Sequence, residues 1–393
     1  MDERRKHETH RQKQETNKIN LAWQGRPAGI RTAMDTTTSI DHVNTTANPI
    51  SFSSDYYDNL KYSLHIMSLC VYGVACVLGV LGNGVVIWVT GFRMKKTVNT
   101  VWFLNLAVAD FLFTAFLPLS ITYQAFNFHW VFGRFMCKLN STVSFLNLYA
   151  SVYTLVVISM DRFVSVVCPI WAQIHRNVRK ASYVSLCVWA FSLSLSLPHF
   201  VFRDTEDMDN SIICYNNYAL SNNYTNPSVI QLVYFRHRAM TITRVLLGFI
   251  IPYSVIISCY AIIFHRIRSS PTLAKQSSRP FKIIAAIIIT FFLCWAPFHI
   301  MTIIELKRFD PSNNSETLFY VITIGLPLST SLAFVNSCLN PILYVFMGQD
   351  FKDKFSKSIL KVFESAFHDD EGNTYMKTLS TSKTRTSDHS TAV

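Results

Sequence analysis

VNTVWFLNLAVADFLFTAFLPLSITYQAF, residues 98–126, is an apolar run with a single charged side chain, Asp110, near its middle. About 20 consecutive apolar residues are enough for a helix to cross the hydrocarbon core of a bilayer. Only helices and closed barrels satisfy their backbone in lipid, and this run does not alternate as a barrel strand would. Seven runs of this kind occur: Leu64–Thr90, Val98–Phe126, Cys137–Val167, Ala181–Val201, Thr241–His265, Phe281–Leu306 and Leu318–Met347. The sequence therefore predicts an all-α fold, a seven-transmembrane helix bundle over residues 64–347.

The composition is typical of a membrane protein, and the sequence contains none of the common catalytic motifs. Half of the residues are hydrophobic and only 15% are charged, whereas soluble domains contain about 25% charged residues. The chain contains no HExxH, GxSxG, P-loop or CxxC motif. We therefore expect neither an enzyme nor a catalytic cofactor, and no nucleic-acid partner.

The charges of the connections predict the orientation in the plasma membrane, because cytoplasmic loops are enriched in Lys and Arg. The first, third and fifth connections carry basic residues and no acid, namely Arg93, Lys95, Lys96, Arg176, Arg179, Lys180, Arg266, Arg268, Lys275 and Arg279. The fourth carries four acids, Asp204, Glu206, Asp207 and Asp209. We therefore expect residues 1–63 outside the cell and the carboxy terminus inside.

The first 33 residues fit an outer tail poorly, since residues 2–33 hold eight Lys or Arg against four Asp or Glu. Met34 begins a stretch that reads as an ordinary outer tail. Residues 1–33 are thus either true ectodomain or an extension upstream of a natural start at Met34.

Two of the nine cysteines fall on the predicted outer side, Cys137 at the start of the third run and Cys214 in the fourth connection. This side is oxidising, so we expect the two thiols to form a disulfide. The glycosylation sequons on the same side are Asn44, Asn223 and Asn313. Asn140 also matches the sequon, but it lies within the third run and we interpret it as a chance match.

Four motifs occur in order along these runs: Leu104–Asp110 (LNLAVAD), Asp161–Phe163 (DRF), Cys294–Pro297 (CWAP) and Asn340–Tyr344 (NPILY). Together they resemble the rhodopsin-like (class A) G-protein-coupled receptors. Further stretches resemble the chemoattractant peptide branch, and the chemerin (chemokine-like) receptors most closely: Val98–Asp110, His129–Gly133, Val201–Asp204 and Leu326–Lys352.

This resemblance implies a receptor for an extracellular chemoattractant peptide or small protein of the chemerin type. Such receptors signal through an inhibitory G protein and arrestin in leukocyte chemotaxis and inflammation. Receptors for formyl peptides, anaphylatoxins or prostanoids are alternatives, as is a decoy that internalises its ligand without a G protein. A transporter or channel is the rival from a different class, but the chain shows no inverted repeat.

The resemblance also implies an allosteric sodium site. Ionisable groups at membrane depth are costly and usually functional, and Asp110 is the only acid in the middle of a run. The positions that correspond to the other oxygen ligands are Asn147, Ser151, Asn336 and Asn340. Hydrogen bonds from asparagine and water to Asp110, without an ion, are the alternative.

A set of switch residues follows from the same motifs: Asp161, Arg162, Tyr260, Trp295, Pro297 and Tyr344. The resemblance implies that Asp161 holds Arg162 until activation. Many such receptors add a second ion pair from this arginine to an acid in the sixth helix, but Pro271–Thr290 contains no acid. We therefore expect appreciable basal activity.

Two charged residues near the outer ends of the fifth and sixth runs, Arg244 and Glu305, correspond to ligand-binding positions. An arginine there can bind the carboxylate or carbonyls of a peptide terminus through two parallel hydrogen bonds. The alternatives are a snorkelling side chain for Arg244 and a plain loop charge for Glu305. The tyrosines in Ser53–Asp58 lie next to acids, so they are either sulfated and attract a basic ligand or are unmodified.

The residues after the seventh run are predicted to lie on the cytoplasmic side of the membrane. Apolar and basic residues alternate at helical spacing in residues 348–364, which predicts an amphipathic helix on membrane lipid. Residues 365–393 are polar and predicted to be disordered. Ten Ser and Thr residues in Thr374–Thr391 are candidates for phosphorylation and arrestin binding. The terminal Thr391-Ala392-Val393 matches a PDZ-binding motif.

Overall fold

The structure is a computed structural model that describes residues 50–208, 211–220, 226–269, 271–307 and 316–347; the side chains at 50–58, 271–283, 316 and 344–347 are not described. Several predicted features lie outside these residues: Asn44, Asn223, Asn313, the segment 348–364, the tail 365–393 and the side chain of Tyr344.

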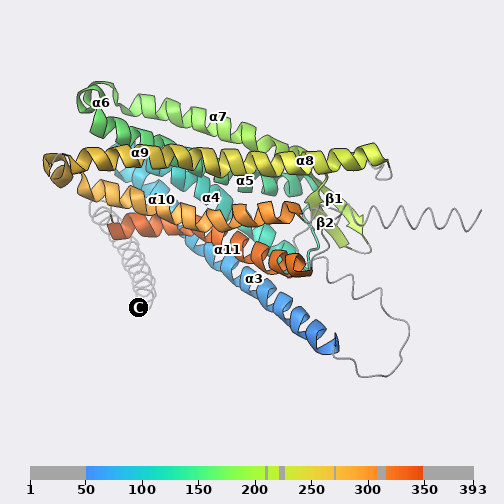
Figure 1. Ribbon diagram of the computed structural model, residues 1–393. Coiled ribbons are helices and arrows are strands. Elements are labelled where there is room, and N and C mark those ends of the chain that lie inside the picture. Colours follow the sequence, from blue (N-terminus) through green and yellow to red (C-terminus); the bar gives the residue numbers. More distant parts are fainter. Residues whose placement is uncertain (1–49, 209–210, 221–225, 270, 308–315, 348–393) are drawn as a thin grey trace, which may run out of the picture.

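The described chain forms a bundle of long helices closed at one end by a β-hairpin (Figure 1). The elements are α3 (Ile50–Trp88), the π-helical turn η1 (Val89–Arg93), α4 (Val98–Ala125), α5 (Gly133–Val167), α6 (Pro169–His175), α7 (Val178–Phe202), β1 (Arg203–Met208), β2 (Ser211–Asn216), α8 (Pro227–Val245), the π-helical turn η2 (Leu246–Ile250), α9 (Ile251–Arg268), α10 (Pro271–Leu306) and α11 (Glu316–Met347).

Seven helical segments within the described residues are long and apolar enough to cross a membrane, which confirms the predicted fold class. Several of the predicted membrane spans were shorter than the helices in the structure. The fifth span begins at Pro227, not at Thr241, and the third begins at Gly133, not at Cys137. Hydropathy finds only the part of a helix that lies in lipid, whereas the backbone stays helical into the polar segment around Arg236 and Arg238.

The hairpin was not predicted. Strands β1 and β2 pair antiparallel, with Asp204 opposite Tyr215 and Thr205 opposite Cys214. The predicted disulfide between Cys137 and Cys214 is confirmed and ties β2 to the first turn of α5. The loop before α5 also holds β2, because the backbone N–H of Trp130 donates to the backbone carbonyl of Ile212 at 2.7 Å.

An ion pair fixes the other strand. Arg134 of α5 donates to both carboxylate oxygens of Asp204, at 2.6 and 2.9 Å. Burial by itself would raise the pKa of Asp204, but the hydrogen bonds from Arg134 and from the Thr205 N–H outweigh it and lower the pKa. Both strands are therefore anchored to α5 across the hairpin end of the bundle.

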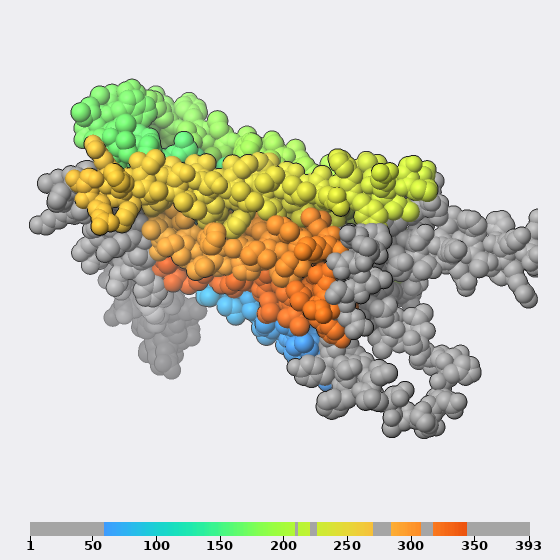
Figure 2. Space-filling view, in the orientation of Figure 1, coloured from blue at the N-terminus to red at the C-terminus, as the bar shows by residue number. Residues whose placement is uncertain are grey.

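Helix α5 forms the centre of the bundle. Its residues Leu148, Val152, Leu155 and Ile158 are buried in the largest core cluster. The other spans bury a smaller share of their apolar window and turn apolar side chains outward, as expected of surfaces that face lipid. Figure 2 shows one such face, where α8 and α9 run end to end and α10 lies beside them.

Candidate functional site

A cavity of about 390 Å³ lies between the helices beneath the hairpin, and its wall is formed by α3, α4, α5, α7, α8, α10, α11 and the hairpin strands. The charged residues in its lining are Lys61, Arg203, Arg244 and Glu305. Among the described residues, three cations against one acid give the cavity a positive field, which favours an anionic ligand group.

Arg244, in the last turn of α8, lines this cavity and is partly buried. Its guanidinium lies between two aromatic rings, 5.5 Å from the centroid of Phe145 and 5.4 Å from that of Phe298. Its Nε has no hydrogen-bond partner among the described residues. A snorkelling arginine would place its charge in water at the rim of the bundle. This one is held inside the bundle, where its buried Nε is costly to leave without a hydrogen-bond acceptor.

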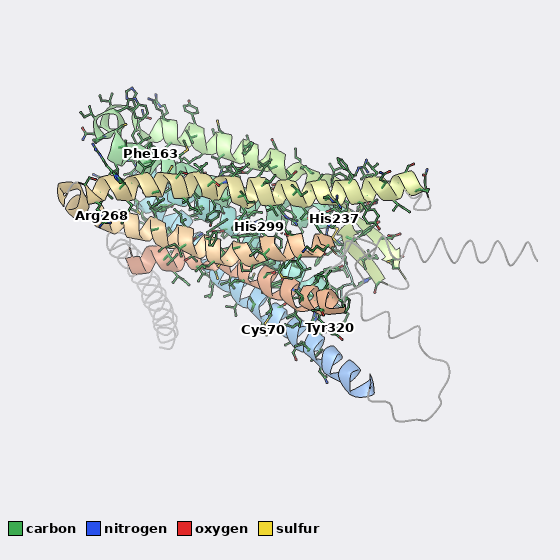
Figure 3. The ribbon with its side chains drawn as sticks, viewed as in Figure 1. Cys70, Phe163, His237, Arg268, His299 and Tyr320 are labelled. Carbon is green, nitrogen blue, oxygen red and sulfur yellow. A yellow bond between two sulfur atoms is a disulfide. The ribbon has the colours of Figure 1, made fainter. Side chains whose placement is uncertain are left out.

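The two rings extend into a longer stack across the cavity wall. The ring of His199, from α7, stacks on Phe145 with centroids 3.4 Å apart. On the other side, Phe298 meets Trp295 edge to face at 5.7 Å. Figure 3 shows His237, another lining residue, near the hairpin end. The stack thus runs from α7 through Arg244 to the predicted switch tryptophan on α10.

Arg203 is a second, partly buried cation in the lining that sequence analysis did not single out. Burial lowers its pKa, and its guanidinium donates to Oδ1 of Asn216 at 3.0 Å and to Sγ of Cys214 at 3.2 Å. Nearby, burial raises the pKa of Tyr218 to about 12, so its hydroxyl stays protonated. The signal for Arg203 was its place in the VFRD stretch directly after the fourth apolar run.

Glu305 lies in the last turn of α10 and lines the same cavity. It interacts electrostatically with Arg244. The structure thus brings the two predicted ligand-binding residues into one cavity, while their contact with a ligand stays a prediction.

The predicted sodium ligands lie below the cavity, and all five side chains are buried. Asn340 donates to Oδ2 of Asp110 at 2.8 Å. With its amide nitrogen facing the carboxylate, Asn147 donates to Oδ1 of Asp110 at 3.2 Å and to Ser151 at the same distance. Asn336 lies one turn before Asn340 on the same face of α11.

One oxygen atom among the five predicted sodium ligands shows whether these residues could bind a cation. Oδ1 of Asn340 is buried and has no hydrogen-bond donor among the described residues. An acceptor left free beside a carboxylate suits a hard cation, which binds oxygen ligands. The residues therefore fit sodium, which stays a prediction.

At the opposite end of the bundle, the predicted pair of Asp161 and Arg162 is not the main contact. These two side chains approach only to 3.6 Å, whereas Arg176 donates to both oxygens of Asp161, at 2.7 and 3.0 Å. Arg162 instead donates to Asn99 Oδ1, which also accepts from Arg176 at 2.6 Å. Arg176 was read from sequence only as a cytoplasmic charge, because nothing in the motif shows that the following connection folds back onto it.

The remaining switch residues occupy the interior of the helices. Tyr260 of α9 interacts electrostatically with Arg162, and Figure 3 shows the neighbouring Phe163 and the end of α9 at Arg268 together at this end of the bundle. Trp295 is buried beneath the cavity, and Pro297 lies inside α10. A switching role for these residues stays a prediction.

Comparison with known proteins agrees with this architecture. Residues 82–344 match the family described as 7 transmembrane receptor (rhodopsin family). The chain is 46% identical over 316 residues to Chemerin-like receptor 1 of Sus scrofa, covering 79% of this chain and 84% of that one. It is 46% identical over 313 residues to Chemerin-like receptor 1 of Homo sapiens, covering 78% and 82%. It is also 41% identical over 327 residues to the C3a anaphylatoxin chemotactic receptor of Oncorhynchus mykiss, covering 80% and 85%. The chain therefore belongs to the rhodopsin family of seven-transmembrane receptors.

Proposed function

We propose that this receptor binds the free carboxy end of a chemoattractant peptide or small protein of the chemerin type. Family membership supports the coarser description: a multi-pass plasma-membrane receptor, from a receptor family and not an enzyme family, with an extracellular ligand and a G protein as partners. An inhibitory G protein, arrestin and a role in leukocyte chemotaxis complete the proposal. Loop charge supports an outward-facing amino terminus and cavity.

The observation that carries the proposal is the guanidinium of Arg244, held between Phe145 and Phe298 with its Nε buried. A terminal carboxylate would supply acceptors to a group whose Nε has none among the described residues. Arg203 adds a second cation to the wall, and the aromatic rings suit a peptide end with apolar side chains. The likeness to chemerin-like receptors supports this ligand class.

An anaphylatoxin is the second candidate, favoured by the likeness to a C3a anaphylatoxin chemotactic receptor. The carboxylate chemistry would be shared, so the choice between the two depends on the remaining peptide sequence. Competition between the carboxy-terminal peptides of chemerin and of C3a, each tested for binding and for suppression of cyclic AMP, separates the two candidates. Agonist-driven arrestin recruitment without any G-protein response would instead indicate a decoy, and ligand-driven sodium current would indicate a channel.

The test of the Arg244 contact is a double-mutant cycle. A charge-assisted hydrogen bond contributes about 1.5–3 kcal/mol, which equals about ten- to a hundredfold in affinity. Arg244→Ala should weaken binding of the free-acid peptide by that factor, and Arg244→Lys should restore only part of it. Amidation of the peptide should weaken binding to the wild type but add little in Arg244→Ala.

A control separates this contact from the general field of the cavity. Arg238 is an exposed arginine on the same helix, and Arg238→Ala removes the same charge outside the cavity. Its effect on peptide affinity should be small and should disappear at high salt. If amidation and Arg244→Ala prove additive, the two groups do not meet, and Arg244 binds no ligand carboxylate.

A further inference from the structure

The backbone between α8 and α9 contains a carbonyl that its own helix cannot satisfy. In the π-helical turn η2, the N–H of Ile251 bonds to the carbonyl of Leu246, five residues earlier. Ile251 is therefore unavailable to Leu247, four residues before it. The next donor that a π-helical turn would offer Leu247 is residue 252, which is proline and has no N–H. The carbonyl of Leu247 needs a partner from elsewhere, because an unpaired backbone group is costly in a membrane.

A side chain from α5 supplies that partner. The hydroxyl of Tyr153 donates to the carbonyl of Leu247 at 2.9 Å. The ring of Tyr153 packs edge to face against Phe191 of α7, with centroids 4.9 Å apart. Tyr153 thus lies between α7 and the irregular turn of the neighbouring helix.

The turn in question determines which residues of α8 face the cavity. Each residue of an α-helix rotates the chain by about 100°, so a turn with one additional residue rotates all of α8 relative to α9 by that angle. Arg244 lies two residues before the first residue of this turn. Gly248, inside the turn, packs closely on α5, since an added Cβ would lie 3.4 Å from both Leu148 and Tyr149. The turn and α5 therefore set the direction of the Arg244 side chain.

We propose that Tyr153 is a positioning residue for the ligand cavity: its hydroxyl replaces the N–H that Pro252 lacks, stabilises η2 and so directs Arg244 inward. This role requires no particular ligand. The proposed role of Tyr153 can therefore be refuted while the proposed peptide contact stands. Likewise, the peptide contact can be refuted while the role of Tyr153 stands.

The test measures the direction of position 244 without any ligand. Arg244→Cys is introduced, and the rate at which a water-soluble methanethiosulfonate reagent modifies it is measured in membranes, with the Arg244 parent as background for the native cysteines. Tyr153→Phe in this background should slow the reaction about tenfold, the factor that corresponds to one buried hydrogen bond of about 1.4 kcal/mol. An unchanged rate would overturn the proposal.

A rescue experiment separates this role from general damage to the core. Pro252→Ala restores an N–H five residues after Leu247, so the rate should no longer depend on Tyr153→Phe. Tyr253→Phe is the matched control, because the Tyr253 hydroxyl also donates to a carbonyl, that of Ile288 at 3.3 Å, which lies within the regular helix α10. This control should leave the rate unchanged.

The rescue also applies if Tyr153→Phe alone fails to reach the membrane. Recovery of surface expression in the double variant with Pro252→Ala would then support the proposal. Continued loss of expression in the double variant would refute it, since the missing donor would have been restored without effect.

Discussion

Replacing Arg176 by alanine should lower the activity of this receptor, because Arg176 competes with Arg162 for Asp161. Arg176 makes two hydrogen bonds to the carboxylate, whereas Arg162 lies 3.6 Å away and donates to Asn99. Without Arg176, Asp161 is free to bind Arg162 directly. Arg162 would then be less available for the G protein.

The geometry sets the size of this effect. Hydrogen bonds to charged groups contribute about 1.5–3 kcal/mol when buried, while exposed ion pairs contribute at most about 1 kcal/mol. The side chain of Arg176 is 29% exposed and that of Asp161 is 10% exposed, so we assign to the pair about 1.5 kcal/mol, the lower end of the buried range. This energy corresponds to about a tenfold change in the ratio of free to captured Arg162.

The assay is basal and agonist-stimulated nucleotide exchange on a G protein in receptor membranes at matched receptor density. Arg176→Ala should lower the basal rate severalfold, and it should have no further effect once Asp161→Asn is present. Arg179→Ala, which removes an exposed charge three residues away, should change little. A higher basal rate in Arg176→Ala would refute the reasoning, because Arg176 would then hold the resting state.

Two further predictions concern the interior and the hairpin. If Asp110 binds sodium, raising the sodium concentration should weaken agonist binding to the wild type, and Asp110→Asn should remove that dependence; a mutant with an unchanged sodium response would exclude the site. Cys214→Ser removes the disulfide to Cys137, which should cost about 2–4 kcal/mol of constraint and most surface ligand binding. Wild-type binding by this variant at equal expression would show that the hairpin does not depend on the bond.

The sequence by itself determined the fold class and the pairing of Cys137 with Cys214. Both follow from local properties. The apolar length of a run decides whether it crosses a bilayer, and the side of the membrane decides which thiols meet an oxidising environment. Asp110 stood out for the same reason, since a charged residue at membrane depth is conspicuous in any single run.

Only the tertiary structure decided which side chains meet across helices. In the sequence, Arg176 lies in a charged connection, Arg203 at the end of an apolar run and Tyr153 within one. Nothing in the sequence shows which residue each of them contacts. Their contacts with Asp161, the cavity and Leu247 depend on how the helices rotate and pack. Because every helix in lipid is apolar on most of its surface, hydropathy specifies its length but hardly its rotation. That rotation is set by packing and by a few interhelical hydrogen bonds.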